Sequence, residues 1–234
     1  MAEPPPPVTF VLGRHAGEKD DGPTAHLGTY RALDGSDGAS LALDLDRPHA
    51  MLVVGKRGYG KSYTLGVLAE ELARSTGLAP VVLDPMGGFS TLTGNTSNQS
   101  VPATVIDNPT IAPDALDPQS WCALLDLSPE SGTGSLLWRA ASEESTLDGM
   151  RDVIRVADAP RAHIRAACNH LDLAESWGIF DAAGLDAGDL RGPAVTVLDL
   201  SGLAARPMNA LARGVIETLY RACMREKGRL PWLL

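Results

Sequence analysis

Apolar and polar positions along the chain fall into two alternating patterns. Short continuous apolar runs, typical of parallel strands buried on both faces, alternate with longer segments in which apolar residues recur every three or four positions. The runs occupy residues 50–55, 80–84, 194–200 and 230–234. This alternation predicts an α/β fold built around a mainly parallel sheet.

Two amphipathic helices are expected after the first and the third of these runs. Apolar residues three or four positions apart predict helices at about 62–74 and 209–227. Gly77 and Gly228 stand just beyond them, where glycine commonly ends a helix. The run at 230–234 then begins another buried strand.

The N-terminal part of the chain predicts a small β element. A proline-rich lead at residues 4–7 precedes a short strand at 8–12 and an acidic loop. Residues 26–33 are expected to pair with 40–45 as a hairpin, because the Asp and Gly residues of 34–38 suit a tight turn. A short β unit is therefore expected ahead of the α/β core.

A helical insertion interrupts the core. A loop rich in Ser, Thr and Asn and a strand-like stretch at 103–106 precede predicted helical segments at 118–126, 133–142, 146–157 and 160–173. We divide the chain into four parts. Residues 1–48 are a proline-rich lead with a small β element, and residues 49–90 are the first part of the core. Residues 91–190 are a largely helical insertion, and residues 191–234 are the second part of the core.

One stretch carries a phosphate-binding pattern. Residues 55–62, GKRGYGKS, match G-x-x-x-x-G-K-[ST] in full, between a predicted buried strand and a predicted amphipathic helix. Glycines let backbone N–H groups approach phosphates, and the N-terminus of a helix favours negative charge. The residues expected to hold the nucleotide are Gly55, Lys56, Arg57, Gly58, Tyr59, Gly60, Lys61, Ser62 and Tyr63.

Lys61 and Ser62 carry the chemistry in this motif. The Lys61 ammonium is expected to reach the β- and γ-phosphate oxygens of ATP as a catalytic group, and the Ser62 hydroxyl to ligate Mg²⁺. Lys56 and Arg57 either approach the phosphates or face solvent.

Two predicted strands end in an aspartate that is a candidate for the metal site. Asp84 and Asp199 each close an apolar run, and each either helps to hold Mg²⁺ or caps the following turn. Neither is followed by Glu, so neither brings a catalytic base. Residues 84–87 also fit the D-x-x-G of GTPases, but the chain contains no N-K-x-D segment to read guanine.

Charge and length narrow the function classes. The net charge of −9 gives no bulk electrostatic support for nucleic-acid binding. Four arginines recur in the predicted helical segments. We interpret them as part of a solvent-exposed helix face rather than a DNA-binding surface: Arg151, Arg155, Arg161 and Arg165. No apolar run approaches the roughly 20 residues that span a bilayer, so no membrane partner is expected.

Cysteine usage and the N-terminus point to a cytoplasmic protein. The start of the chain has neither a basic flank nor an apolar segment typical of a secretion signal. Three widely spaced cysteines in apolar surroundings, Cys122, Cys168 and Cys223, are interpreted as buried thiols rather than disulfides or zinc ligands.

Taken in order, these motifs resemble those of a known family. The run HAMLVVGKRGYGKSYTLGVLAEEL, then PVVLDPMGGF, a helical insertion, VTVLDLSGL and a long helix leading into LPWLL is similar to the HerA branch of the FtsK–HerA DNA-pumping ATPases, especially its archaeal members. The resemblance covers residues 25–234 and is strongest at 49–90 and 194–234.

The resemblance implies a RecA-like P-loop domain that assembles as a homo-oligomeric ring, usually a hexamer. Such rings hydrolyse ATP between subunits and move double-stranded DNA, in some cases beside a nuclease partner. In this family the strand after the long helix ends in an Asp-Glu pair, which we expect just beyond Leu234. The chain as given is then expected to be a fragment that binds nucleotide and hydrolyses it poorly.

Two departures from the family pattern stand beside the resemblance. Members commonly carry Glu where this chain has Gly88, and their N-terminal β-barrel has more strands than residues 1–48 can supply. Two other functions are therefore considered. One is a nucleotide-binding regulatory or scaffold subunit without motor activity, and the other is a small-molecule P-loop kinase whose lid would recruit Arg139, Arg151 and Arg155.

Overall fold

A computed structural model describes residues 9–15, 22–75, 77–89, 92, 101–225 and 230–234. The proline-rich lead, most of the Ser/Thr/Asn-rich loop, and Gly228 with the last two residues of the second predicted helix lie outside the described residues. No helix in the described ranges is long and apolar enough to cross a bilayer.

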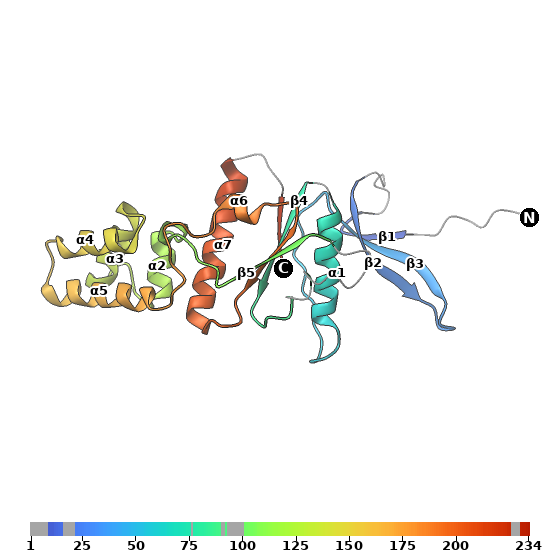
Figure 1. Ribbon diagram of the computed structural model, residues 1–234, viewed down its shortest axis with the longest axis horizontal. Helices are drawn as coiled ribbons and strands as arrows, with labels where there is room; N and C mark the ends of the chain where they lie inside the picture. The colour runs from blue at the N-terminus through green and yellow to red at the C-terminus, as the bar shows by residue number, and fades with distance from the viewer. Residues whose placement is uncertain (1–8, 16–21, 76, 90–91, 93–100, 226–229) are drawn as a thin grey trace, which may run out of the picture.

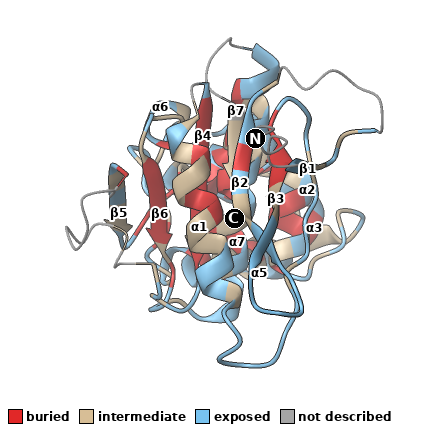
Figure 2. Cartoon of the chain, turned by 90° about the vertical axis from the view of Figure 1, so that its right-hand side faces the viewer, coloured by how far each residue is buried: buried red, intermediate tan, exposed pale blue. Residues whose placement is uncertain are grey.

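A four-stranded parallel sheet forms the centre of the molecule. Its strands are β4 (Leu78–Asp84), β5 (Ala103–Asp107), β6 (Val195–Asp199) and β7 (Leu230–Leu233). They lie in the order β5-β6-β4-β7, and every neighbouring pair is parallel. The predicted α/β fold with a mainly parallel sheet is confirmed, and Figure 2 shows β4 and β6 buried along most of their length.

Two helices cover the two faces of this sheet, α1 (Lys61–Arg74) on one side and α7 (Ala205–Arg225) on the other (Figure 1). Successive side chains of a strand point to opposite faces. Val82 accordingly packs with Ala69 of α1, and Val81 belongs to the cluster that contains Leu211 and Val215 of α7. Both predicted helices are confirmed within the described residues.

A second, three-stranded sheet packs on the outer side of α1. Its strands are β1 (Thr9–Leu12), β2 (Thr24–Arg31) and β3 (Asp37–Asp44), in the order β1-β3-β2. β2 and β3 form the expected antiparallel hairpin. Leu43 and Leu45 share a buried cluster with Leu68 and Leu72 of α1, so the N-terminal sheet supports the helix that carries the glycine-rich turn.

A buried ion pair fastens the N-terminal sheet. The Arg14 Nε donates to Asp44 Oδ1 at 2.9 Å, and Asp44 is only 1% exposed. Burial opposes ionisation of this carboxyl, but the hydrogen bond and then the charge of Arg14 outweigh it and hold the pKa of Asp44 below its ordinary value. The pair therefore stabilises the folded state with Asp44 ionised.

Replacing Asp44 by asparagine is expected to remove an acid-sensitive part of the stability. A carboxyl with a lowered folded-state pKa contributes stability that is complete above its unfolded pKa, near 4, and is lost as pH falls through the folded pKa. We expect the wild type to exceed Asp44→Asn by about 2–3 kcal/mol in free energy of unfolding at pH 7. Urea titrations at pH 7 and pH 3 measure this difference. A difference that does not shrink in acid would contradict the assignment.

The insertion is largely helical, and its buried residues join the hydrophobic core that lies between the sheet and α7. Its elements are the 3₁₀ turn η2 (Pro113–Ala115) and the helices α2 (Pro118–Leu124), α3 (Gly132–Glu143), α4 (Leu147–Arg155), α5 (Arg161–Glu175) and α6 (Ala187–Leu190). Trp121, Leu137 and Met150 are fully buried in one cluster with Leu211 of α7. Residues 103–107, inside the predicted insertion, form strand β5 of the central sheet.

Arg151 is not part of a solvated helix face, so that interpretation of this residue is wrong. It is 6% exposed and binds three carboxylates, those of Asp148, Asp172 and Glu175. Burial opposes its charge, but Glu175 and Asp172 outweigh burial and raise the pKa of Arg151. Arg151 therefore joins α4 to α5. The helical pattern placed it among other exposed arginines and could not reveal partners 21 and 24 residues away.

Residues 50–55 do not form the buried strand that their apolar pattern predicts. They pair with no strand in the described part of the chain, and Leu52 and Val54 are 87% and 76% exposed. The segment instead runs past the end of β7, where Met51, Leu52 and Val53 line a hollow with Trp232 and neighbouring leucines. A strand needs a neighbouring strand for its hydrogen bonds and covering layers for its two faces. In the described part of the chain β7 pairs with β4, and residues 50–55 do not join the sheet.

The cysteines differ from one another in exposure. Cys122 is buried, Cys168 is partly buried, and all three are free thiols. Cys223 is exposed, so its interpretation as a buried thiol is wrong. It lies in the last turn of α7, beyond the buried residue Leu219.

Candidate nucleotide-binding site

The glycine-rich turn adopts a backbone that only glycine accepts readily. Gly58 and Gly60 have φ angles of +83° and +82°, and Gly60 is the residue immediately before α1. A side chain at either position would meet no atom within 4 Å. Backbone conformation, rather than space, therefore requires glycine at both positions.

Lys61 is held across the turn by its own backbone. Its Nζ donates to the carbonyl oxygens of Gly55 at 2.9 Å and Lys56 at 3.0 Å. A Cβ on Gly55 would lie 3.7 Å from Lys61 Cγ, which shows how closely the stem of the lysine follows the turn. The ammonium is thus placed at the mouth of the turn.

The N-terminus of α1 has no protein cap. Among the described residues no side chain accepts from its first N–H groups, and no acidic residue stands in its first turn. The first backbone hydrogen bond of the helix joins Thr64 N to Gly60 O at 2.9 Å. Unpaired donors and the positive end of the helix dipole make this terminus suited to an anion.

A hollow of about 330 Å³ opens in front of these groups. Its lining residues are Arg57, Gly58, Gly60, Lys61, Ser62 and Tyr63. Six of the nine residues predicted to hold the nucleotide therefore meet around one space, and Gly55, Lys56 and Tyr59 do not line it. The Ser62 hydroxyl makes no hydrogen bond within the described ranges and is exposed, which suits a metal ligand.

The carboxylate of Asp84 accepts hydrogen bonds from the turn that follows β4. Its two carboxylate oxygens accept from the backbone N–H groups of Met86 at 3.1 Å and Phe89 at 2.8 Å, and the residue is 2% exposed. The sequence left two roles open for Asp84, a ligand of Mg²⁺ and a cap of the following turn, and these hydrogen bonds are those of a turn cap. The D-x-x-G segment is accordingly a closed turn at the end of β4.

Asp199 is more accessible than Asp84. Its Oδ1 accepts from the backbone N–H of Ser201 at 2.9 Å, and this bond, followed by one from the Ser201 side chain, lowers the pKa of Asp199. The carboxylate is therefore readily ionised and only partly engaged. Gly87 brings the two strand ends together, since a Cβ there would lie 3.3 Å from Ser201 Oγ.

A third strand-end aspartate went unnoticed in the sequence. Asp107 ends β5 and lies in register with Asp199, which lies in register with Asp84. The signal was available, because Asp107 follows the apolar residues 105–106 just as Asp84 and Asp199 follow the apolar residues before them. In the described part of the chain, no three acidic, His or Cys side chains stand close enough to form a metal site by themselves.

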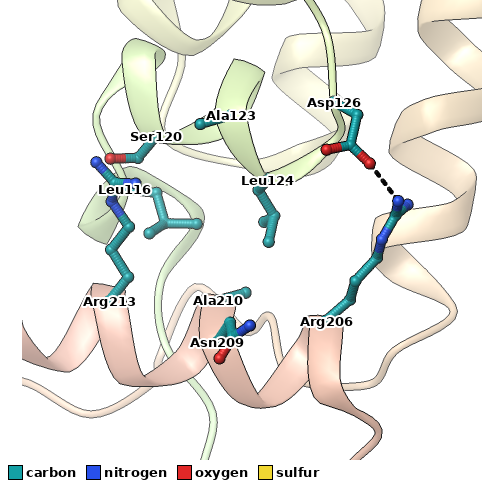
Figure 3. A pocket seen from close by; sticks show the side chains of 9 residues that line it. All are labelled: Leu116, Ser120, Ala123, Leu124, Asp126, Arg206, Asn209, Ala210 and Arg213. Atoms are coloured by element: carbon teal, nitrogen blue, oxygen red, sulfur yellow. Dashed lines mark hydrogen bonds and ion pairs between the residues drawn. The ribbon is translucent and has the colours of Figure 1, made fainter.

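A second hollow, of about 260 Å³, lies between α2 and α7 (Figure 3). Ser120, Leu124 and Asp126 line it from one side, and Arg206, Asn209 and Arg213 line it from α7. Its arginines are already paired, Arg206 with Asp126 and Arg213 with Glu217. These pairs neutralise the cations that an anionic ligand would need.

Fold and turn together define the class of protein. A parallel sheet between helices, with a glycine-rich turn opening α1, is the arrangement of a RecA-like P-loop domain. In Figure 1 this turn, at the lower end of α1, lies at the same end of the molecule's sheet as the start of α7. That end carries the carboxyl termini of the strands, where open α/β sheets bind ligands.

Comparison with protein families identifies the particular group. Residues 25–147 match the family described as "Helicase HerA, central domain", over more than half of the chain, and the chain belongs to this family. The HerA resemblance of the sequence is confirmed. Members are ATPases of the FtsK–HerA type that generally use ATP and Mg²⁺ and typically form rings acting on DNA. No curated protein matches the chain significantly.

Proposed function

We propose that this chain is the ATP-binding core of a HerA-like translocase or helicase that couples ATP hydrolysis to movement of double-stranded DNA. The observation that carries the proposal is the uncapped N-terminus of α1, with Lys61 held across the glycine turn, in a chain of the HerA family. The subunits are proposed to form a homo-oligomeric ring, with a hexamer as the family precedent, and to work beside a nuclease.

The residues of the turn suit a nucleoside triphosphate with Mg²⁺. The N–H groups that begin α1 would bind phosphate oxygens, and Lys61 would exchange its carbonyl acceptors for them. Arg57 lines the same hollow and carries a positive charge, whereas Lys56 contributes its carbonyl to Lys61. A bound Mg²⁺ would neutralise charge that develops on the phosphates.

Ser62 is the residue proposed to ligate Mg²⁺ directly. Asp199, partly engaged and readily ionised, is proposed as an acid that supports the metal through water. For Asp84 the metal role is the weaker proposal, because both carboxylate oxygens already accept backbone N–H groups. With Asp84 committed to its turn and Gly88 in place of a Glu, slow turnover by residues 1–234 is expected.

A regulatory or scaffold subunit without motor activity is the second candidate. The acidic net charge and the commitment of Asp84 to its turn favour it. The kinase alternative loses support, because Arg139, Arg151 and Arg155 each pair with carboxylates inside the insertion. They lie in the helices at the far end of the molecule from α1 in Figure 1.

The two candidates differ in DNA-stimulated turnover. Steady-state ATP hydrolysis by the product of the complete gene is measured with and without linear double-stranded DNA, with Lys61→Ala as the inactive control. The translocase proposal expects hydrolysis that rises with DNA and is absent in the control. Saturable ATP binding without turnover, in either condition, would instead support the regulatory subunit.

A further inference from the structure

Two tyrosines stand on either side of Gly60, Lys61 and Ser62. Tyr59 and Tyr63 are each 78% exposed, and neither ring contacts another aromatic side chain within the described ranges. They differ in one respect, because Tyr63 lines the hollow beside Lys61 and Ser62 whereas Tyr59 does not. Among the described residues that line this hollow, Tyr63 alone is aromatic.

We propose that Tyr63 stacks on the base of the nucleotide that binds at the turn. The inference rests on the proposed function, because it requires the phosphates to bind at the start of α1. Tyr63 follows Lys61 and Ser62 within the first turn of that helix, and this residue lines the hollow that the phosphates would occupy. The ribose and base of a nucleotide extend from the α-phosphate and must lie against a neighbouring surface.

The exposed ring offers such a surface at little cost. Covering an aromatic face with a base removes apolar area from water on both partners, and stacking of this kind is tolerant of base identity. The hydroxyl of Tyr63 makes no hydrogen bond in the described part of the chain, so stacking would break none. Tyr63 therefore contributes to binding of the nucleoside part, while Lys61 and Ser62 act on the phosphates.

Binding of ATP and of inorganic tripolyphosphate separates these contributions. Isothermal titration calorimetry, with Mg²⁺ present, compares the wild type with Tyr63→Ala, Tyr63→Phe and the control Tyr220→Ala, an exposed tyrosine of α7. We expect Tyr63→Ala to weaken ATP binding by about tenfold to hundredfold and to leave tripolyphosphate binding unchanged. Tyr63→Phe keeps the ring and should keep the difference between the two probes. Tyr220 lies outside the hollow, so Tyr220→Ala should bind both probes like the wild type.

Each other outcome overturns the proposal. If Tyr63→Ala weakens ATP and tripolyphosphate equally, the residue supports the turn rather than the base. If it changes neither affinity, or if Tyr220→Ala has the same selective effect, Tyr63 does not stack on the base. Binding of neither probe by the wild type would reject the proposed function itself.

Discussion

Replacing Lys61 by alanine is expected to lower the affinity for ATP by about a hundredfold or more, and to abolish turnover. The ammonium lies at the mouth of the turn, held by the carbonyls of Gly55 and Lys56, and would form charge-assisted hydrogen bonds to phosphate. Each such bond contributes about 1.5–3 kcal/mol, and each 1.4 kcal/mol is tenfold in affinity. Isothermal titration calorimetry with Mg²⁺ and ATP measures the loss.

Lys56→Ala is the matched control for this substitution. Lys56 carries the same charge within the same turn, but it meets Lys61 through its backbone carbonyl, which alanine retains. Its side chain does not line the hollow, so its removal should change the affinity by no more than a few fold. Circular dichroism checks that both variants are folded. Unchanged ATP affinity in a folded Lys61→Ala variant would reject the site.

Replacing Trp121 by alanine is expected to lower the free energy of unfolding by about 3–5 kcal/mol. Trp121 is fully buried, stacks on Phe180 with ring centroids 4.9 Å apart, and donates from Nε1 to the carbonyl of Pro113 at 3.0 Å. Alanine would leave a cavity and an acceptor without its partner. Because this cluster includes Leu211 of α7, the loss should appear in the unfolding of the core as well as of the insertion.

Trp138→Ala serves as the control for Trp121→Ala. Trp138 lies on α3, is 37% exposed, and is not one of the residues of the buried cluster that contains Trp121. We expect this variant to lose less than about 2 kcal/mol in urea unfolding, because the site stays open to water. Equal losses in the two variants would show that Trp121 is not the centre of the core.

The regular elements could be predicted because local patterns determine them. Leu68 and Leu72 recur at helical spacing and are buried in α1. The expected hairpin forms, with the turn at residues 32–36 and Asp37 and Gly38 already in β3. The glycine motif likewise predicted the turn, since positive φ angles at Gly58 and Gly60 are what its glycines permit. Short-range sequence spacing carries this information.

Features that depend on distant partners could not be predicted in the same way. Residues 50–55 are apolar enough for a buried strand, but pairing needs a partner strand from a distant part of the chain, and none of the described strands pairs with them. Arg151 looks like its exposed neighbours until α5 brings Asp172 and Glu175 to it. The local pattern at Asp84 fits a metal ligand and a turn cap equally, and the N–H groups of Met86 and Phe89 favour the cap.

The most direct test of the nucleotide site is a crystal structure of the protein with Mg²⁺ and a non-hydrolysable ATP analogue. We predict phosphate oxygens bonded to Lys61 Nζ and to the first N–H groups of α1, Mg²⁺ on the Ser62 hydroxyl, and Asp84 still capping its turn. Nucleotide bound elsewhere, such as between α2 and α7, with the glycine-rich turn unchanged and free of phosphate, would contradict the central claim.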